Sequence, residues 1–273
     1  MGVMMQDARA EEAIRSGSVQ QLVAALAEGA NPDRVLESGY PLIHAATDKN
    51  DALLVGVLLR MGANPIAQDA LGDTALHLAA EKNFTGSAIV LLDNKADPSV
   101  LSARGDTPMH RAAGGGSRNV LVVMLSRGAD PNLRLEADGQ APLHTAAASN
   151  HRDVAEVLLQ YGADIDASDS DGQTALMEAA KVGAIDVIQF LLERHANVDI
   201  QDKEGRTALA WAATKGDWPQ VVALLVKAGA RVGLRDRTGN TALSRAELLG
   251  HQQTARVLSR NAGALAGGPD AKS

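Results

Sequence analysis

Apolar residues recur in short groups along this chain, and their spacing predicts pairs of short helices. Leu54-Val55 and Leu58-Leu59 lie four residues apart, which places them on one face of a helix. A shorter segment with small residues on one side, such as Ala79-Ala80, comes before each apolar group. Polar stretches rich in Asp, Asn, Pro and Gly separate the pairs and predict turns.

The helix pairs follow a fixed period. One phrase reads GDTALHLAA from Gly72 and GQTALMEAA from Gly172, and its copies are spaced by 33 or 34 residues. The copies begin at Gly39, Gly72, Gly105, Gly139, Gly172, Gly205 and Gly239. A second phrase, GADP from Gly128, recurs in the same register. The two phrases together divide the chain into eight repeats, near 6–34, 35–67, 68–100, 101–133, 134–167, 168–200, 201–234 and 235–262.

The repeated positions have clear local roles. The shared glycine permits a turn with positive φ. The threonine that often follows it is a good N-cap for the first helix; it stands at Thr74, Thr107, Thr174, Thr207 and Thr241. The glycine of the second phrase is typical of a left-handed cap that ends the second helix.

These phrases resemble the ankyrin repeat family, and the resemblance covers about Ala8 to Leu258. It implies an all-α repeat solenoid in which antiparallel helix pairs stack and β-hairpin or turn fingers project from them. It also implies a concave face formed by the fingers and the first helices. We expect one ankyrin repeat domain over 1–262, with polar residues covering both ends, and a disordered tail over 263–273, where no period continues.

Composition narrows the possible functions. Aromatic residues make up only 2% of the chain, which suits thin layers of closely packed helices. A net charge of −7 argues against a nucleic-acid binder. No cysteine is present, so disulfides, thiolate metal sites and a cysteine nucleophile are excluded. No apolar run approaches the roughly 18 residues of a membrane span, and no secretory signal starts the chain. We therefore expect no membrane insertion and favour the cytoplasm, or the periplasm if a signal was removed.

Four histidines share one position of the repeat: His44, His77, His110 and His144. Neighbouring repeats would hold them about 10 Å apart, whereas zinc ligands all lie about 2 Å from one ion. We expect each to bond to finger backbone instead. Gly114-Gly115-Gly116 lacks the context of a phosphate loop, and acid pairs such as Asp169/Asp171 lie in solvated fingers. No catalytic residue, metal or cofactor is expected.

Residues that the repeat does not require are the candidates for binding. They are Tyr40, Arg104, Asp138, Lys203, Glu204, Arg206, Trp211, Lys215, Trp218 and Arg237. Trp211 takes a position held elsewhere by Arg111 and Glu178, which predicts partial exposure, and Trp218 is an extra residue in a turn. Alternatively, Trp211 packs between first helices and Trp218 covers the turn. The extra residue in the finger over 133–138 either reaches a partner or is tolerated variation.

The sequence favours a monomeric, non-enzymatic module that binds a protein partner, of unknown identity, through the concave face and fingers. One alternative is an inhibitor or immunity-type protein that neutralises an enzyme. Another is the ankyrin part of a larger bacterial or host-directed effector. An enzyme would require a pocket with perturbed titratable groups, which the sequence does not indicate.

Overall fold

The computed structural model describes residues 2–266, and the chain divides into two compact units, unit 1 (Met1–Leu135) and unit 2 (Glu136–Ser273). Within residues 2–266 every regular element is a helix. Each unit holds four helix pairs, so the eight predicted repeats correspond to eight pairs. The all-α stacked-repeat fold is therefore confirmed.

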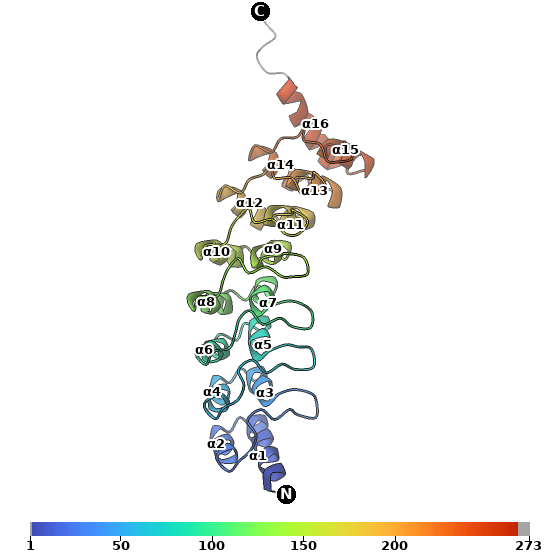
Figure 1. The fold of residues 1–273 in the computed structure, drawn as a ribbon. Coiled ribbons are helices and arrows are strands. Elements are labelled where there is room, and N and C mark those ends of the chain that lie inside the picture. The colour runs from blue at the N-terminus through green and yellow to red at the C-terminus, as the bar shows by residue number, and fades with distance from the viewer. Residues whose placement is uncertain (1, 267–273) are drawn as a thin grey trace, which may run out of the picture. The chain divides into compact units, whose positions relative to one another are not determined.

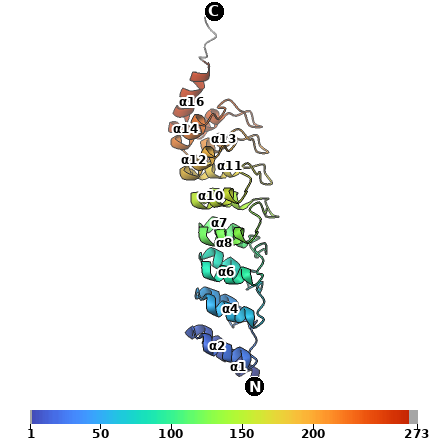
Figure 2. The same cartoon turned by 90° about the vertical axis from the view of Figure 1, so that its left-hand side faces the viewer.

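Unit 1 contains two layers of helices (Figures 1 and 2). The first helices of its pairs are α1 (Gly2–Ser16), α3 (Leu42–Asp48), α5 (Ala75–Glu81) and α7 (Pro108–Gly115). The second helices are α2 (Val19–Ala27), α4 (Ala52–Arg60), α6 (Thr85–Asp93) and α8 (Arg118–Ser126). The loops between pairs project as fingers from the layer of first helices.

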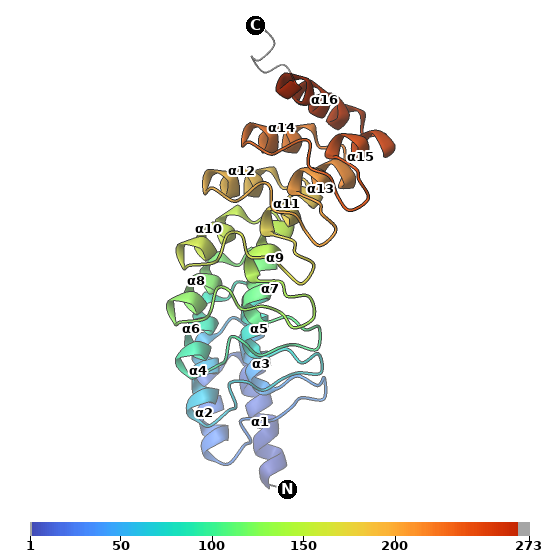
Figure 3. The ribbon, with the colours of Figure 1, turned by 45° about the horizontal axis from the view of Figure 1, so that its top comes forward.

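Unit 2 repeats the arrangement (Figure 3). Its first helices are α9 (Pro142–Ala148), α11 (Ala175–Val182), α13 (Ala208–Lys215) and α15 (Ala242–Leu248). Its second helices are α10 (Arg152–Gln160), α12 (Ile185–Glu193), α14 (Pro219–Lys227) and α16 (Gln252–Ala266). Successive first helices pack directly on one another, as α11 does on α9 and α13.

The predicted caps set where the helices begin and end. The hydroxyls of all five threonines accept the N–H of the third residue of their helix. Gly62 follows the end of α4 with φ of +95°. Lys95 and His195 hold the same position in their repeats with φ of +67° and +64°, although neither is glycine.

The core is a thin layer between the two sets of helices. First helices contribute fully buried alanines such as Ala79 and Ala80, and second helices contribute leucines such as Leu91 and Leu158. Small side chains let neighbouring first helices approach closely. This explains how the chain builds its core with so few aromatic rings.

The fingers are turns, three of which are closed by isolated antiparallel bridges, such as Gln68 with Thr74, and no extended strand forms in the described residues. Several fingers also bond to the previous one through backbone: Ala103 N donates to Leu71 O, Lys203 N to Asp171 O and Arg237 N to Glu204 O. The shared glycine makes room for this contact. A Cβ at Gly72, where φ is +70°, would lie 2.6 Å from Ala103 N.

Helices extend slightly beyond both ends of the predicted repeats. α1 begins at Gly2, ahead of the expected start near residue 6. α16 continues to Ala266, so the first four residues of the expected tail, 263–266, are helical. The rest of that tail, 267–273, lies outside the described residues.

Candidate functional site

The repeat histidines hold fingers in place. The Nε2 atoms of His44, His77 and His144 lie 2.8, 3.2 and 3.0 Å from backbone carbonyls of the following finger. Nδ1 of His77 accepts the N–H of Thr74 at 3.0 Å, so its proton is on Nε2, which donates to Asp106 O. His110 Nδ1 lies 2.8 Å from Thr107 Oγ1.

His44 lacks one of these bonds. Pro41 replaces the capping threonine in its repeat and has no N–H, so His44 Nδ1 is buried without a hydrogen-bond partner. Burial lowers the pKa of both His44 and His77, which keeps these imidazoles neutral near pH 7.

Arg111 lies at the centre of a buried charge network in unit 1. Its guanidinium bonds both carboxylate oxygens of Asp73, at 2.6 and 3.0 Å, and both of Asp106, at 2.9 Å each. Burial alone would lower the pKa of Arg111, but these hydrogen bonds outweigh it and raise the pKa. Burial raises the pKa of Asp106, but hydrogen bonds from Arg111 and Ser102 reverse the effect and lower it. The network joins two adjacent fingers.

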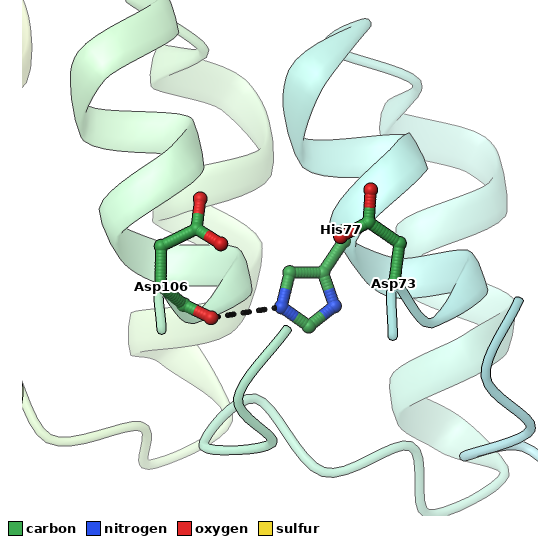
Figure 4. A group of neighbouring side chains, drawn as sticks. All are labelled: Asp73, His77 and Asp106. Atoms are coloured by element: carbon green, nitrogen blue, oxygen red, sulfur yellow. Dashed lines mark hydrogen bonds between the residues drawn. The ribbon is translucent and has the colours of Figure 1, made fainter. Parts of the chain in front are cut away.

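Asp73, His77 and Asp106 lie close enough together to suggest a metal site. Figure 4 shows that the His77 ring is directed at the backbone carbonyl of Asp106 and not at its carboxylate. Both ring nitrogens are already hydrogen-bonded, and Arg111 occupies the carboxylates. The guanidinium supplies the positive charge that an ion would bring, so these groups act as a structural network.

Trp211 is at the centre of a different cluster in unit 2. Its indole Nε1 donates to Asp202 Oδ2 at 3.0 Å, and Arg206 Nε donates to the same oxygen at 3.0 Å. Three cations lie over the indole: the Arg206 Cζ and the Lys181 and Lys215 Nζ atoms are 3.9, 4.6 and 5.5 Å from the ring centroid. Asp202 is fully enclosed. We call Lys181, Asp202, Arg206, Trp211 and Lys215 the Trp211 cluster.

The expectation that Trp211 is partly exposed is wrong, because the residue is only 6% exposed. The inference assumed that a position occupied by Arg111 and Glu178 must face solvent. Both of those residues are buried as well, since Arg111 pairs with finger carboxylates and Glu178 with Lys181 at 2.6 Å. A charged residue at this position indicates a nearby counter-charge rather than exposure.

Trp218 packs across two inter-helix turns. A Cβ built at Gly183 would lie 3.1 Å from its indole, and one built at Gly216 would overlap the ring. The residue precedes Pro219 at the start of α14 and remains 36% exposed. Trp218 thus covers the turns and still presents part of its ring to solvent.

The other candidate residues are distributed over both units. Tyr40 and Arg104 belong to unit 1; Tyr40 is half-buried with its ring edge against His44, and Arg104 is exposed. Burial, followed by the charge of Asp48, raises the pKa of Tyr40. Five candidates in unit 2 are exposed: Asp138, Lys203, Glu204, Lys215 and Arg237. Arg206 is half-buried in the Trp211 cluster.

Sequence reasoning missed the Arg111 network and the role of Asp202. One signal was available for the network. Aspartates follow the shared glycine in two successive repeats, at Asp73 and Asp106, and the second repeat places arginine at a position filled by Leu78 in the first. Two aspartates and one arginine at matching positions of successive repeats predict ion pairs between them, provided that adjacent fingers lie close together.

The architecture defines a class of protein: stacked helix pairs with projecting fingers and a period of 33 residues. The family model described as "Ankyrin repeats (3 copies)" matches residues 11–102, 42–135, 84–169, 109–202 and 176–266. Together these matches span nearly all of the chain, which belongs to the ankyrin repeat family.

Solved structures give the same result. The ankyrin repeat domain of Bcl-3, described as a unique member of the IkappaB family, is 25% identical with a TM-score of 0.72, and the match covers 80% of this chain and 97% of that one. The human ASB11 ankyrin repeat domain is 28% identical with a TM-score of 0.72, covering 84% and 99%. No curated protein sequence matches.

Family membership sets the general function. Ankyrin repeat domains mediate protein–protein interactions and are typically non-enzymatic. None of the helices between residues 2 and 266 has both the length and the apolar character needed to cross a membrane.

Proposed function

We propose that this chain is a non-enzymatic, monomeric module that binds a protein partner mainly through the fingers and first helices of unit 2. The observation that carries the proposal is the surplus of unpaired cations there. Lys203, Lys215 and Arg237 are exposed and have no carboxylate within salt-bridge distance among the described residues. Exposed charges with no internal partner remain available for recognition.

Two of the neighbouring acids are already paired. Asp202 bonds Arg206 and Trp211, and Asp236 bonds Arg245. Burial raises the pKa of Asp236, but hydrogen bonds from Thr238 and Arg245 outweigh burial and lower it. The fingers themselves are fixed by backbone hydrogen bonds, so little ordering cost accompanies association.

The test uses the full chain as bait against an extract of its native source, followed by identification and quantification of the captured protein. Lys203→Glu combined with Arg237→Glu should lower capture by about tenfold, because rim charges steer and orient a partner. Arg118→Glu is the control, since Arg118 is exposed at the start of a second helix of unit 1 and is not a candidate binding residue. Equal capture by the double variant and the wild type, with unchanged melting midpoints, would refute the role of unit 2.

The alternative role as an inhibitor predicts a further result. A captured partner that is an enzyme should lose activity when the chain is added in equimolar amount, whereas an adaptor leaves activity unchanged. Analytical ultracentrifugation of the free chain tests the monomeric state.

A further inference from the structure

α16 carries two arginines that its place in the repeat does not require. Arg256 and Arg260 stand at positions that α12 fills with Gln189 and Glu193. Both arginine side chains are exposed, and neither forms an ion pair or a hydrogen bond among the described residues. They lie four residues apart on one face of the helix, where like charges repel each other. Packing within the repeat therefore gives no reason for this pair.

The two arginines line a hollow between α14 and α16, which pack side by side (Figure 3). The hollow has a volume of about 380 Å³, and its other lining residues are Pro219, Gln252, Gln253 and Val257. This volume falls within the range of roughly 300–1,000 Å³ that is typical of small-ligand sites. We call this space the arginine hollow. It combines two cationic side chains and two amides with a small apolar wall.

Three other hollows of the described residues hold an acid beside each cation. The pairs are Arg9 with Glu12, Lys227 with Glu193, and Arg256 with Glu247. Arg256 thus borders a second hollow, between α15 and α16, but no ion pair joins it to Glu247 within the described part of the chain. Among these four hollows, the arginine hollow has cations and no carboxylate in its described lining.

Asp217, two residues before Pro219, is the acid closest in sequence to the α14 side of the arginine hollow. Its carboxylate accepts the backbone N–H of Thr254 at 2.7 Å and of Gln253 at 3.3 Å. These bonds, that of Thr254 first, lower the pKa of Asp217 and keep it ionised at the positive end of α16. The carboxylate therefore balances the helix terminus, and the two guanidiniums remain without a counter-charge.

We infer that the arginine hollow binds a phosphomonoester group. Such a group carries nearly two negative charges at pH 7, and a guanidinium bonds phosphate oxygens in pairs. Two arginines match this charge, whereas a carboxylate would leave one of them uncompensated. The amides of Gln252 and Gln253 would donate to the remaining oxygens, and Val257 and Pro219 would contact the organic part of the ligand. The hollow lies on the second helices, so this inference goes beyond the proposed function and does not depend on it.

The experiment titrates the full chain with phenyl phosphate at pH 7.5 and follows backbone amide shifts by NMR. Benzoate and methyl phenyl phosphate carry the same ring with a single charge and serve as control ligands. Phenyl phosphate should shift amides of α16 and of the start of α14. It should bind about tenfold more tightly than either control ligand, because its second charge meets the second guanidinium.

Substitutions test which side chains bind the ligand. Arg256→Gln with Arg260→Gln should lower the affinity for phenyl phosphate by about tenfold or more. Arg60→Gln with Arg118→Gln is the matched control, because it removes two exposed arginines from second helices of unit 1. This control should bind as the wild type does. All four side chains are exposed, so melting midpoints should stay unchanged.

A charge-conserving variant separates a built site from diffuse attraction. Arg256→Lys with Arg260→Lys keeps both charges but loses the planar forks, so it should bind more weakly than the wild type. Wild-type affinity in this variant would overturn the inference. So would the absence of shifts, equal affinity for phenyl phosphate and the two control ligands, or an equal loss in the unit 1 control.

A free phosphorylated compound and the headgroup of phosphatidic acid share the phosphomonoester chemistry. Flotation with vesicles that contain phosphatidic acid distinguishes these sources. Binding to the vesicles that is lost in the Arg256→Gln, Arg260→Gln variant would support the inference and assign the group to a lipid. Binding of phenyl phosphate without binding to vesicles would support it equally and assign the group to a soluble compound.

Discussion

One position of the repeat holds Arg111 in unit 1 and Trp211 in unit 2, and the two side chains are buried in opposite ways. The arginine is enclosed by carboxylates of two fingers. The tryptophan is enclosed by three cations, with one finger aspartate accepting its N–H. The same backbone position can thus bury a charged group or an aromatic ring, depending on which side chains surround it. Around Arg111 the charges neutralise one another, whereas around Trp211 the cations Lys181 and Arg206 are paired with Glu178 and Asp202 and Lys215 has no carboxylate partner among the described residues.

The largest effect should come from Arg111→Leu, which introduces the residue that Leu78 places at this position. Asp73 and Asp106 would lose their cation, at a cost of about 3 kcal/mol or more in the free energy of unfolding. Urea titration followed by circular dichroism measures this. Adding Asp73→Asn and Asp106→Asn should recover most of the loss. Arg104→Leu, an exposed control, should stay within about 0.5 kcal/mol of the wild type, and an equal loss in both variants would contradict the network.

Trp211→Ala should cost about 3 kcal/mol because it leaves a cavity between packed first helices. Trp211→Phe retains a ring for the cations but loses the bond to Asp202, so its loss should be smaller, about 1–2 kcal/mol. Urea unfolding distinguishes the two variants. Trp211→Ala with an unchanged unfolding free energy would show that the ring is a free binding surface and not a buried element.

Lowering the pH should destabilise unit 1 before unit 2. Burial lowers the pKa of His44 and His77 below the unfolded value of 6.5, so the unfolded chain binds protons at higher pH than the folded one. Their contribution is complete above pH 6.5 and declines as the pH falls through it. The equivalent residues in α11 and α13 are Met177 and Ala210, which do not titrate. Hydrogen exchange at pH 7 and pH 5, corrected for the intrinsic rate, should show greater loss of protection in α3 and α5. Equal loss in all four helices would contradict this.

The smallest effects on stability should come from two substitutions to glycine, and they should be equal in the two units. Lys95→Gly in unit 1 and His195→Gly in unit 2 relieve a left-handed backbone that glycine adopts freely, and each should gain about 1 kcal/mol. Thermal melting measures the gain. Gly62→Lys, the reverse exchange at the same position, should lose a similar amount. Opposite signs at Lys95 and His195 would show that local contacts outweigh backbone strain.

Local features were predictable from the sequence because they depend on neighbours along the chain. The threonine caps bond residues three positions away, and the shared glycine carries its positive φ wherever the phrase recurs. The period of 33 residues then fixes the stacking, since one helix pair cannot bury its apolar face alone.

Burial of individual polar and aromatic side chains was not predictable in this way. Arg111 meets Asp73 across 38 residues, and whether they meet depends on the side-chain directions of two fingers. Trp211 was misjudged because its burial depends on the finger of its own repeat, which supplies Asp202, and on the preceding repeat, which supplies Lys181. Arg206, Trp211 and Lys215 are all among the candidates that the sequence indicates, and the three lie together. Their role in binding stays a prediction.

At the fingertips, adjacent fingers meet through main-chain atoms, from Ala103 N to Leu71 O in unit 1 and from Arg237 N to Glu204 O in unit 2. Side chains at the fingertips can therefore be exchanged without weakening the scaffold that displays them. Under the proposed function, single substitutions at 104, 203 or 237 would retarget the protein, while the glycines and threonines beneath stay under separate constraint.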